Sequence, residues 1–369
     1  MLTRRQTVLG AAAGAALPTL STLVACAPNT SHADAVRSIW RHGGGSATIT
    51  DRAALLRELV RYATLAPSSH NTQCWKFRMD ERAITIEPDL SRRCPAVDPD
   101  DHHLFVSLGC AAENLAQAAL AHGLKAEPAT AASGADGIAL NLEPTRAQAS
   151  PLFQAIVERQ STRGDYDGQP LAADELRLLE QAGSGVGVRV MLLTERPAMD
   201  KVLEYVVSGN SAQMNDAAFV AELKAWIRFS ADQAVKSGDG LFAGSSGNPS
   251  LPPWLAKPLM SLFFTEKSEN DKYAQQMRSS AGVAVFVSEA NDKTHWIETG
   301  RCYERFALQA AALGIRNALL NQPVEVAAIR PQFAAWLGVG ALRPDLVVRF
   351  GRGPTMPRSL RRPVQAVLV

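Results

Sequence analysis

The feature that most constrains the fold is an apolar segment that occurs twice, at residues 109–124 and at residues 300–315. Both copies contain a Gly followed by an aliphatic residue at their end, which is a common C-terminal stop for a helix. Small residues recur along both copies and allow helices to pack closely. The copies share residues at matching positions, among them the pairs Gly109/Gly300, Glu113/Glu304, Ala119/Ala310 and Gly123/Gly314. The repeat predicts two related helices and a chain built from two halves; a chance match between two Ala-rich helices is the alternative.

The rest of the sequence predicts a mixed α and β architecture. Residues 51–65 carry apolar side chains at helical spacing, and Asp51 is expected to cap the N-terminus of that helix. Further helices are predicted at 151–159 and 173–182. The expected strands are short and lie at 75–79, 83–87, 137–142, 187–193, 282–288 and 345–350.

The segment from about 196 to 278 has no counterpart in the first half of the chain. It contains helical patterns near 198–208 and 216–236, followed by a loop rich in Gly, Ser and Pro at 237–253. Long loops in compact domains are often functional. We therefore expect this insertion to be a lid or an interface element.

The N-terminus has the layout of an export signal. Arg4 and Arg5 precede an Ala-rich apolar run that ends near Ala25, and paired arginines indicate the twin-arginine route. Leu23-Val24-Ala25-Cys26 resembles a bacterial lipobox, in which Cys26 would carry the lipid. We expect residues 1–26 to be the signal, residues 27–50 to be a linker, and the protein to reach the periplasm or cell envelope. An uncleaved anchor or a cytoplasmic tail is the alternative.

Composition excludes several classes of function. A net charge of +2 with 20% charged residues predicts no nucleic-acid surface. Five cysteines without a C-x-x-C pair predict neither a zinc motif nor a redox dithiol, and Cys110 and Cys302 are expected to be buried. The acidic and histidine-rich run at 98–103 is predicted to be a solvated turn that caps a helix rather than a metal site.

The run at 66–77 contains the most specific motif. Pro67 should end the preceding helix, and the polar side chains that follow would offer hydroxyl and amide groups to a planar polar ligand. The run resembles the A-P-S-x-x-N-x-Q-P-W-x-F signature of the nitroreductase family, which binds FMN, although Cys74 stands where that family usually has Pro. A plain helix stop is the alternative. The resemblance implies that the flavin ring or ribityl chain contacts Pro67, Ser68, Ser69, Asn71 and Gln73.

A second motif lies in the other half of the chain. Two arginines flank two hydroxyls in Arg159-Gln160-Ser161-Thr162-Arg163, a set of donors that suits phosphate, although it could be an ordinary surface run. It resembles the R-R-S-x-R element of nitroreductases, with Gln160 in place of the second Arg. The resemblance implies that this element fixes the FMN phosphate through Arg159, Ser161, Thr162 and Arg163. The C-terminal run resembles the basic tail that completes the phosphate site, which implies contacts from Arg358, Arg361 or Arg362; a free basic tail is the alternative.

A third element follows the second repeat helix. Gln322-Pro323-Val324-Glu325 resembles the P-x-E-G-like loop that lies beside flavin N5 in nitroreductases, although the Gly is missing. The resemblance implies that Gln322, Pro323 and Glu325 border the cofactor.

The motifs are divided between the halves. The Pro-Ser turn is present only in the first half and the Arg-Ser-Arg element only in the second. Nitroreductases are homodimers with FMN at the interface, and this division resembles the Acg-type branch of that family. The resemblance implies an α+β fold of two fused halves, 51–150 and 151–369, that form an intramolecular pseudo-dimer with mostly antiparallel sheets, packed helices and a lid-like insertion.

The resemblance also implies a function. The expected protein is a functional monomer and an FMN-dependent oxidoreductase, which transfers hydride or electrons from a small-molecule donor to a nitroaromatic or quinone-like acceptor. FMN carries the chemistry, so we predict no catalytic side chain and no metal. We expect the protein to contact a membrane only through a lipid attached to Cys26. Two alternatives are a protein that binds or sequesters flavin with little turnover, and a flavin-free lipoprotein that serves as an interaction module.

Overall fold

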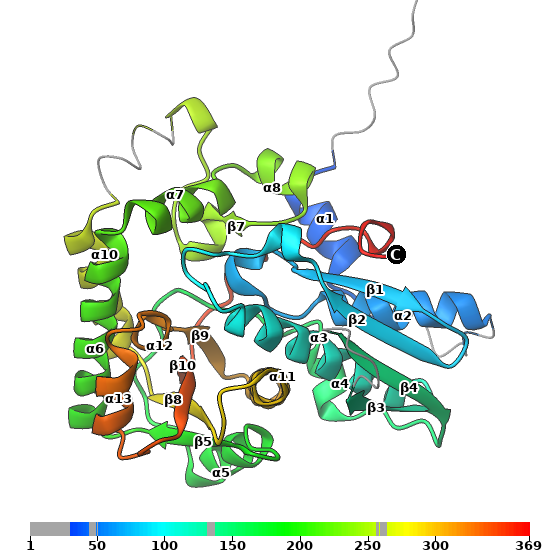
Figure 1. Cartoon of the computed structure of the whole chain (residues 1–369). Helices are drawn as coiled ribbons and strands as arrows, with labels where there is room; N and C mark the ends of the chain where they lie inside the picture. The colour runs from blue at the N-terminus through cyan, green and yellow to red at the C-terminus, as the bar shows by residue number, and fades with distance from the viewer. Residues whose placement is uncertain (1–29, 44–48, 50, 131–136, 256–257, 259–263) are drawn as a thin grey trace, which may run out of the picture. The chain divides into compact units, whose positions relative to one another are not determined.

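Two four-stranded antiparallel sheets have the same strand order, which confirms that the chain is built from two related halves. The computed structural model (Figure 1) describes residues 30–43, 49, 51–130, 137–255, 258 and 264–369. The first sheet has the order β1-β2-β4-β3 and contains β1(Trp75–Met79), β2(Ala83–Pro88), β3(Leu124–Thr130) and β4(Ile138–Pro144). The second has the order β5-β8-β10-β9 and contains β5(Val188–Leu193), β8(Gly282–Ser288), β9(Arg316–Leu319) and β10(Arg343–Gly351). Matching these strands in chain order pairs β1 with β5, β2 with β8, β3 with β9 and β4 with β10.

The two repeat helices pack against each other at the centre of residues 31–369, which form one compact unit. They are α3(His102–Ala121) and α11(Lys293–Ala312), and Figure 1 shows both between the two sheets. By length and hydropathy alone α3 could cross a membrane, but most of this helix is buried in the hydrophobic core. The predicted duplication is confirmed, because α3 and α11 occupy the same place in the chain order of their halves.

Each sheet is extended by a segment from outside its own set of strands. The last residues pair with β1, where the Phe77 amide donates to the Val367 carbonyl over 2.7 Å and the Val369 amide donates to the Phe77 carbonyl over 3.1 Å. Ser161 forms a parallel bridge with Asn317 of β9. The C-terminus of the second half therefore completes the sheet of the first half, which ties the halves together.

A helix precedes the first strand of each half. These helices are α2(Arg52–Thr64), capped by Asp51 as predicted, and α5(Ala173–Ala182). The helix expected at 151–159 is shorter, since α4 spans Pro151–Ala155. The short helices described outside the insertion also include η1(Ser69–Asn71), η2(Leu90–Arg92), α12(Gln322–Glu325), α13(Arg330–Trp336) and η4(Val364–Ala366).

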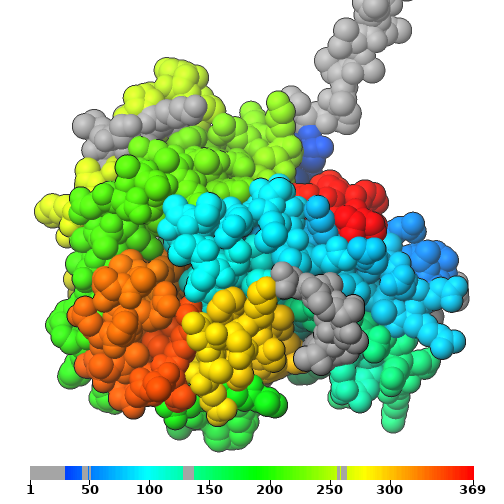
Figure 2. Space-filling model, in the orientation of Figure 1, coloured from blue at the N-terminus to red at the C-terminus, as the bar shows by residue number. Residues whose placement is uncertain are grey.

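The insertion lies between β5 and β8, where the first half has only a short turn between β1 and β2. It contains α6(Arg196–Met214), α7(Ala217–Trp226), β6(Ile227–Arg228), α8(Ala231–Ser237), β7(Leu241–Phe242), η3(Ala243–Ser246) and α10(Glu266–Arg278). The helix expected at 216–236 is interrupted, because Ile227 and Arg228 pair with β7. Met199, Val202 and Met277 share a core with Val283 and Val347 of the second sheet, so α6 and α10 are integral to the fold. In Figure 2 the green surface of the insertion lies against the cyan surface of the first half.

The expected linker at 27–50 contains a helix. α1(His32–Ile39) is capped by Ser31, and its Ala35 shares a small core with Phe242 and Leu360. The Trp40 indole nitrogen donates to the Ser359 carbonyl over 3.0 Å. These contacts with distant residues order a segment whose composition alone suggested a tether. The predicted signal, including Cys26, lies outside the described residues.

Candidate functional site

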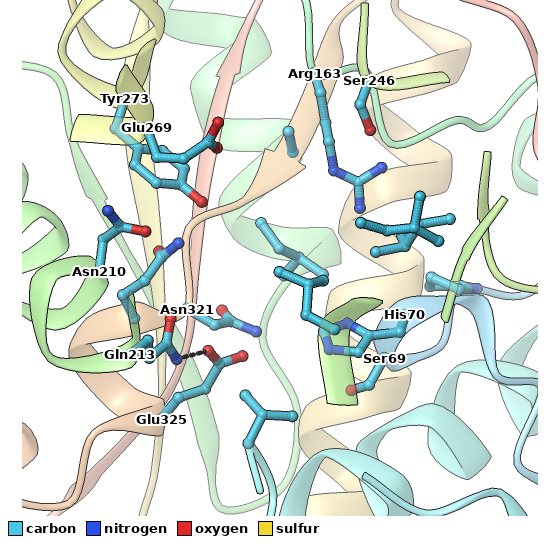
Figure 3. A pocket seen from close by; sticks show the side chains of 18 of the residues that line it. Ser69, His70, Arg163, Asn210, Gln213, Ser246, Glu269, Tyr273, Asn321 and Glu325 are labelled. Carbon is cyan, nitrogen blue, oxygen red and sulfur yellow. Dashed lines mark hydrogen bonds between the residues drawn. The ribbon is translucent and has the colours of Figure 1, made fainter. Parts of the chain in front are cut away.

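A cavity of about 520 Å³ lies where the two halves meet the insertion. The first half contributes the turn after α2 and part of α3, and the second half contributes Arg163 and the segment around α12. The insertion contributes side chains from α6, α7 and α10. Figure 3 shows Ser69, His70 and Arg163 on one side of the cavity and Asn210, Gln213 and Tyr273 on the other. A volume of this size is typical of small-molecule and cofactor sites.

The turn that borders the cavity has a strained backbone. His70, Asn71 and Gln73 have φ angles of 49°, 53° and 54°, so three non-glycine residues of one turn occupy the left-handed region. Such conformations are unfavourable by about 1–3 kcal/mol each and persist where the surroundings enforce them, often at functional sites. The polar sequence of the predicted motif therefore encodes a turn that the rest of the fold must hold in place.

Asn71 and Gln73 hold this turn rather than face the cavity. The Asn71 side-chain amide donates to the Gly240 and Leu360 carbonyls over 3.0 and 3.2 Å, and its oxygen accepts from Arg361 Nη1 over 3.0 Å. Gln73 Nε2 donates to the Gly238 carbonyl over 2.8 Å, and Gln73 Oε1 accepts from the Arg362 amide over 2.8 Å. Both side chains are buried, and they attach the turn to the insertion and to the C-terminal tail. Both side chains therefore support the turn, and their contact with a cofactor stays a prediction.

Arg163 provides an unpaired cation in the cavity. Its guanidinium points into the cavity in Figure 3, and within the described part of the chain it forms no ion pair and donates no hydrogen bond. Burial lowers the pKa of this guanidinium, because the surrounding protein solvates its charge less well than water does. A cation in this environment favours a ligand with negative charge or with hydrogen-bond acceptors.

The opposite wall of the cavity is also polar, and it carries a carboxyl group and amide groups. Glu325 accepts a hydrogen bond from Gln213 Nε2 over 2.7 Å, the contact drawn in Figure 3. Burial raises the pKa of the Glu325 carboxyl, which favours its neutral form. Gln322 Oε1 is buried and has no hydrogen-bond partner among the described residues. The cavity therefore offers a free acceptor and a carboxyl group opposite the Arg163 cation.

The other predicted arginines are bound to protein groups. Arg159 forms a buried ion pair with Glu304 over 3.1 Å and donates to the Leu65 carbonyl over 2.6 Å. Arg361 donates to the carbonyls of Thr64, Leu65 and Ala66 over 2.8 to 3.0 Å. These contacts bring the second motif and the tail to the end of α2, as the division of motifs predicted, but the side chains support the turn and do not line the cavity.

The remaining predicted residues divide in the same way. Arg358 donates to the Arg159 carbonyl and lies over the Trp40 ring, while Arg362 donates to the Gln73 and Ala366 carbonyls. Thr162 and Pro323 are buried, and Ser161 is placed by its bridge to β9. Six of the predicted residues line the cavity: Pro67, Ser68, Ser69, Arg163, Gln322 and Glu325.

Several residues that line the cavity were not among the site residues predicted from the sequence motifs. His70 is a variable position of the first motif, yet its ring lines the cavity and its Nε2 is buried without a hydrogen-bond partner among the described residues. Burial, followed by the charge of Arg163, lowers the pKa of His70 to about 4, so its imidazole is neutral at pH 7. Asn210, Gln213 and Tyr273 come from the insertion, for which the sequence offered only the general signal of a long extra segment.

The run at 98–103 is only in part the predicted solvated turn, because Pro99 and Asp100 are exposed whereas Asp98 and the two histidines are buried. Asp98 accepts hydrogen bonds from the His103 and Leu104 amides over 3.0 and 2.9 Å, which satisfies the first turn of α3. His102 Nε2 lies 2.8 Å from Asp345 Oδ1. The predicted capping role is confirmed for Asp98, whereas the predicted exposure is wrong for Asp98, His102 and His103. The four described cysteines, Cys74, Cys94, Cys110 and Cys302, are free and buried.

Comparison with known proteins identifies relatives along most of the chain. Two proteins of Mycobacterium tuberculosis named "Putative NAD(P)H nitroreductase" are similar to it. Rv3131 is 24% identical over 331 residues, which cover 86% of this chain and 91% of the relative. The protein acg is 22% identical over 334 residues, which cover 85% of this chain and 95% of the relative. No protein-family model matches the chain.

Solved structures with local similarity are smaller proteins. One is the FMN-dependent nitroreductase NfnB from Mycobacterium smegmatis, solved in complex with NADPH. The match covers 55% of this chain and 87% of the NfnB chain, with 14% sequence identity and a TM-score of 0.37. Another is a putative nitroreductase from Desulfovibrio desulfuricans, solved in complex with FMN. The match covers 60% of this chain and 97% of that protein's chain, with 17% sequence identity and a TM-score of 0.35. The resemblance of this chain to the nitroreductase family, and within it to the Acg-type branch, is confirmed by the similarity of its sequence to the mycobacterial relatives over most of its length.

Proposed function

We propose that the protein is an FMN-dependent oxidoreductase that passes hydride or electrons from a small-molecule donor to a small acceptor of the nitroaromatic or quinone class. The observation that carries this proposal is the convergence of both halves on one cavity, in which the Arg163 cation and the buried Gln322 oxygen lack partners among the described residues. The relatives are named as NAD(P)H nitroreductases, which agrees with this chemistry.

The donor set fits a flavin. Apolar side chains such as Val106 and Leu319 line the cavity together with polar groups, as a planar heteroaromatic ring with polar edges requires. Ser68, Ser69 and the Arg163 guanidinium would hold the cofactor on one side, and Gln322 and Glu325 would border it on the other. The flavin supplies the hydride chemistry when bound, while the protein orients it and excludes water.

The phosphate of FMN needs a cation near its binding place. Arg159 and Arg361 are committed to Glu304 and to main-chain carbonyls, so the cavity itself offers Arg163 and Lys272 as its cationic side chains among the described residues. We propose that Arg163, alone or together with Lys272, holds the phosphate, with Ser69 or Ser246 as hydroxyl donors. Arg159, Arg361, Asn71 and Gln73 would contribute by fixing the turn.

Sequestration of the flavin is the second candidate function. Phe219, Leu223 and Leu251 of the insertion cover one side of the cavity, which would restrict the access of an acceptor to the bound ring. Removing the whole insertion is a poor test, because α6 and α10 contribute to the core of the second half. Replacing Leu223→Ala opens the wall with a smaller change. Repeated turnover of a quinone with NADPH identifies an enzyme, whereas equimolar bound flavin with no turnover in the wild type and in Leu223→Ala identifies a flavin store.

The cell biology of the protein is also a proposal. Arg4 and Arg5 support export by the twin-arginine route, which suits a protein that acquires its cofactor before export. We propose a lipid on Cys26, a location in the periplasm or cell envelope, and a functional monomer in which the two halves replace the two subunits of a dimer. Labelling with a radioactive fatty acid, lost in Cys26→Ser, tests the lipid.

The replacement Arg163→Met tests the flavin site. The expected result is at least a tenfold weaker retention of FMN, measured by flavin fluorescence on titration, because the cation facing the cavity is lost. Arg196→Met is the matched control, since Arg196 donates to the Arg278 and Ser280 carbonyls outside the cavity. Equal FMN affinity in both variants and the wild type would contradict the proposed site.

A further inference from the structure

We propose that His70, Cys94 and Glu222 form a binding site for a divalent transition metal, of which zinc is the best fit. One ligand atom from each residue, an imidazole nitrogen, the thiol sulfur and a carboxylate oxygen, lie within 4.8 Å of one another. The three residues come from three separate segments, which are η1, the loop after η2, and α7 of the insertion. Such a convergence of sulfur, nitrogen and oxygen is the donor set of a mixed zinc site.

Two of the three groups, His70 and Cys94, lack the partners that would otherwise explain their positions. His70 Nε2 is buried and has no hydrogen-bond partner among the described residues. Cys94 is 4% exposed and free, and within the described ranges its sulfur makes no hydrogen bond. Polar groups that are buried without partners are rare in proteins, and a missing ion is one of the explanations for them.

The charge around Glu222 points in the same direction. Its carboxylate accepts hydrogen bonds from the Ala96 and Val97 amides over 3.0 and 3.2 Å, so it is fixed beside Cys94. Within the described part of the chain, the Glu222 carboxylate forms no ion pair with a lysine, arginine or histidine. A divalent cation would neutralise both this carboxylate and the thiolate that Cys94 becomes when it binds metal. Binding must release the Cys94 proton, since burial raises the pKa of that thiol.

The geometry requires only a small contraction. Neighbouring ligand atoms in a tetrahedral zinc site are about 3.3–3.8 Å apart, given metal–ligand distances of about 2.0–2.3 Å. The ligand atoms, which lie within 4.8 Å of one another, would therefore approach by about 1.5 Å at most. His70 has a left-handed backbone with φ of 49°, and its ring lies at the cavity in Figure 3.

A three-residue site leaves one position of the metal open. Zinc with three protein ligands and one open position is the arrangement of catalytic zinc sites, in which the metal polarises a bound oxygen. His70, Val97 and Leu223 line the cavity, so the site lies at the cavity wall. The metal would link the Pro-Ser turn of the first half to α7 of the insertion, and an oxygen of a bound acceptor could reach its open position.

Metal titration of the full chain tests the proposal. The purified protein is stripped with a chelator, exchanged into metal-free buffer, and titrated with Zn²⁺ or with Co²⁺ as a spectroscopic probe. We expect one metal per chain, a thiolate-to-cobalt charge-transfer band in the near ultraviolet, and visible bands of tetrahedral cobalt. Cys94→Ser should remove the charge-transfer band and weaken zinc binding at least tenfold, and Glu222→Gln should also weaken binding at least tenfold.

A matched control and a second readout keep the test decisive. Cys302→Ser removes another buried free thiol and should bind metal like the wild type. Zinc should raise the unfolding temperature of the wild type and of Cys302→Ser but not that of Cys94→Ser. If Cys94→Ser does not fold, Glu222→Gln in the partly exposed helix α7 carries the test. Less than stoichiometric metal in the wild type, or unchanged binding in Cys94→Ser or Glu222→Gln, would overturn the site without bearing on the flavin.

Discussion

Gly109 of α3 and Gly300 of α11 lie against each other where the two halves cross. A Cβ atom on Gly109 would lie 2.0 Å from the Ile297 carbonyl oxygen, and a Cβ atom on Gly300 would lie 2.0 Å from the Val106 carbonyl oxygen. Neither main chain can move aside without separating the helices. The same two glycines occupy matching positions of the sequence repeat, so the duplicated sequence encodes its own self-complementary contact.

Adding a methyl group at this crossing should destabilise the whole chain. We expect Gly109→Ala or Gly300→Ala to lower the free energy of unfolding by about 3 kcal/mol or more, because the added atom overlaps a main-chain oxygen and overpacking is costly in a core. Gly314→Ala is the control: among the described residues, no atom beyond its chain neighbours would lie within 4 Å of the added Cβ, so this variant measures the left-handed backbone alone, about 1–2 kcal/mol. Urea unfolding compares the three variants. Equal losses at all three positions would mean that the helices do not cross at the glycines.

Two arginines four residues apart should have opposite roles. Arg159→Met leaves the buried Glu304 carboxylate without its partner, so at pH 8, where this carboxyl is ionised in the wild type, we expect a loss of about 3–5 kcal/mol in the free energy of unfolding. Arg163→Met removes a cation that has no partner among the described residues, so the stability of the flavin-free protein should change by less than about 1 kcal/mol. Chemical denaturation of both flavin-free variants measures the contrast. A large loss in Arg163→Met with little change in Arg159→Met would reverse the assignment.

The Glu304 carboxyl should make stability depend on pH. Burial raises its pKa to about 7 in the folded chain, against an ordinary value near 4.5. The folded state therefore binds the proton more tightly than the unfolded state, and this contribution is complete below pH 4.5 and is lost as the pH rises through 7. Glu304→Gln cannot titrate, so we expect it to gain stability relative to the wild type between pH 5 and about 8. The difference in urea midpoint measured across this range checks the direction; a constant difference would show that the carboxyl does not titrate there.

The strained turn should depend on Asn71 in two separable ways. Asn71→Ala loses hydrogen bonds to Gly240, Leu360 and Arg361 and also places Ala at a φ of 53°. Asn71→Gly loses the same hydrogen bonds but adopts this backbone without strain. We expect Ala to be about 1 kcal/mol less stable than Gly, and both to be about 2 kcal/mol or more below the wild type. If the two variants unfold at the same urea concentration, the turn does not hold a left-handed Asn71.

Much of the fold could be predicted because many of its strands have an apolar or alternating pattern in their own local sequence. The runs at 75–79 and 282–288 are apolar or alternate, and they form β1 and β8 as expected. β9 was missed because Arg316 and Asn317 carry no strand signal of their own; its conformation comes from pairing with β10. α1 was missed for a similar reason, since its contacts come from the far end of the chain.

The candidate site could be located from sequence but not resolved into roles. The motifs identified the two segments that meet, and Ser69 and Arg163 do line one cavity. They could not separate Arg163 from Arg159, because the direction of each side chain depends on the Glu304 carboxylate and on carbonyls at the end of α2. The cavity-lining side chains Gln213 and Tyr273 belong to the insertion, in which the sequence showed no motif, so only the structure reveals them.

The measurement that tests the account most directly is the flavin content of the purified chain after incubation with excess FMN and gel filtration. The absorbance of the flavin relative to that of the protein gives the stoichiometry. We predict one FMN per chain on a monomeric species, because one cavity is assembled from the complementary halves of one polypeptide. A colourless protein, or two FMN per chain, would contradict this account.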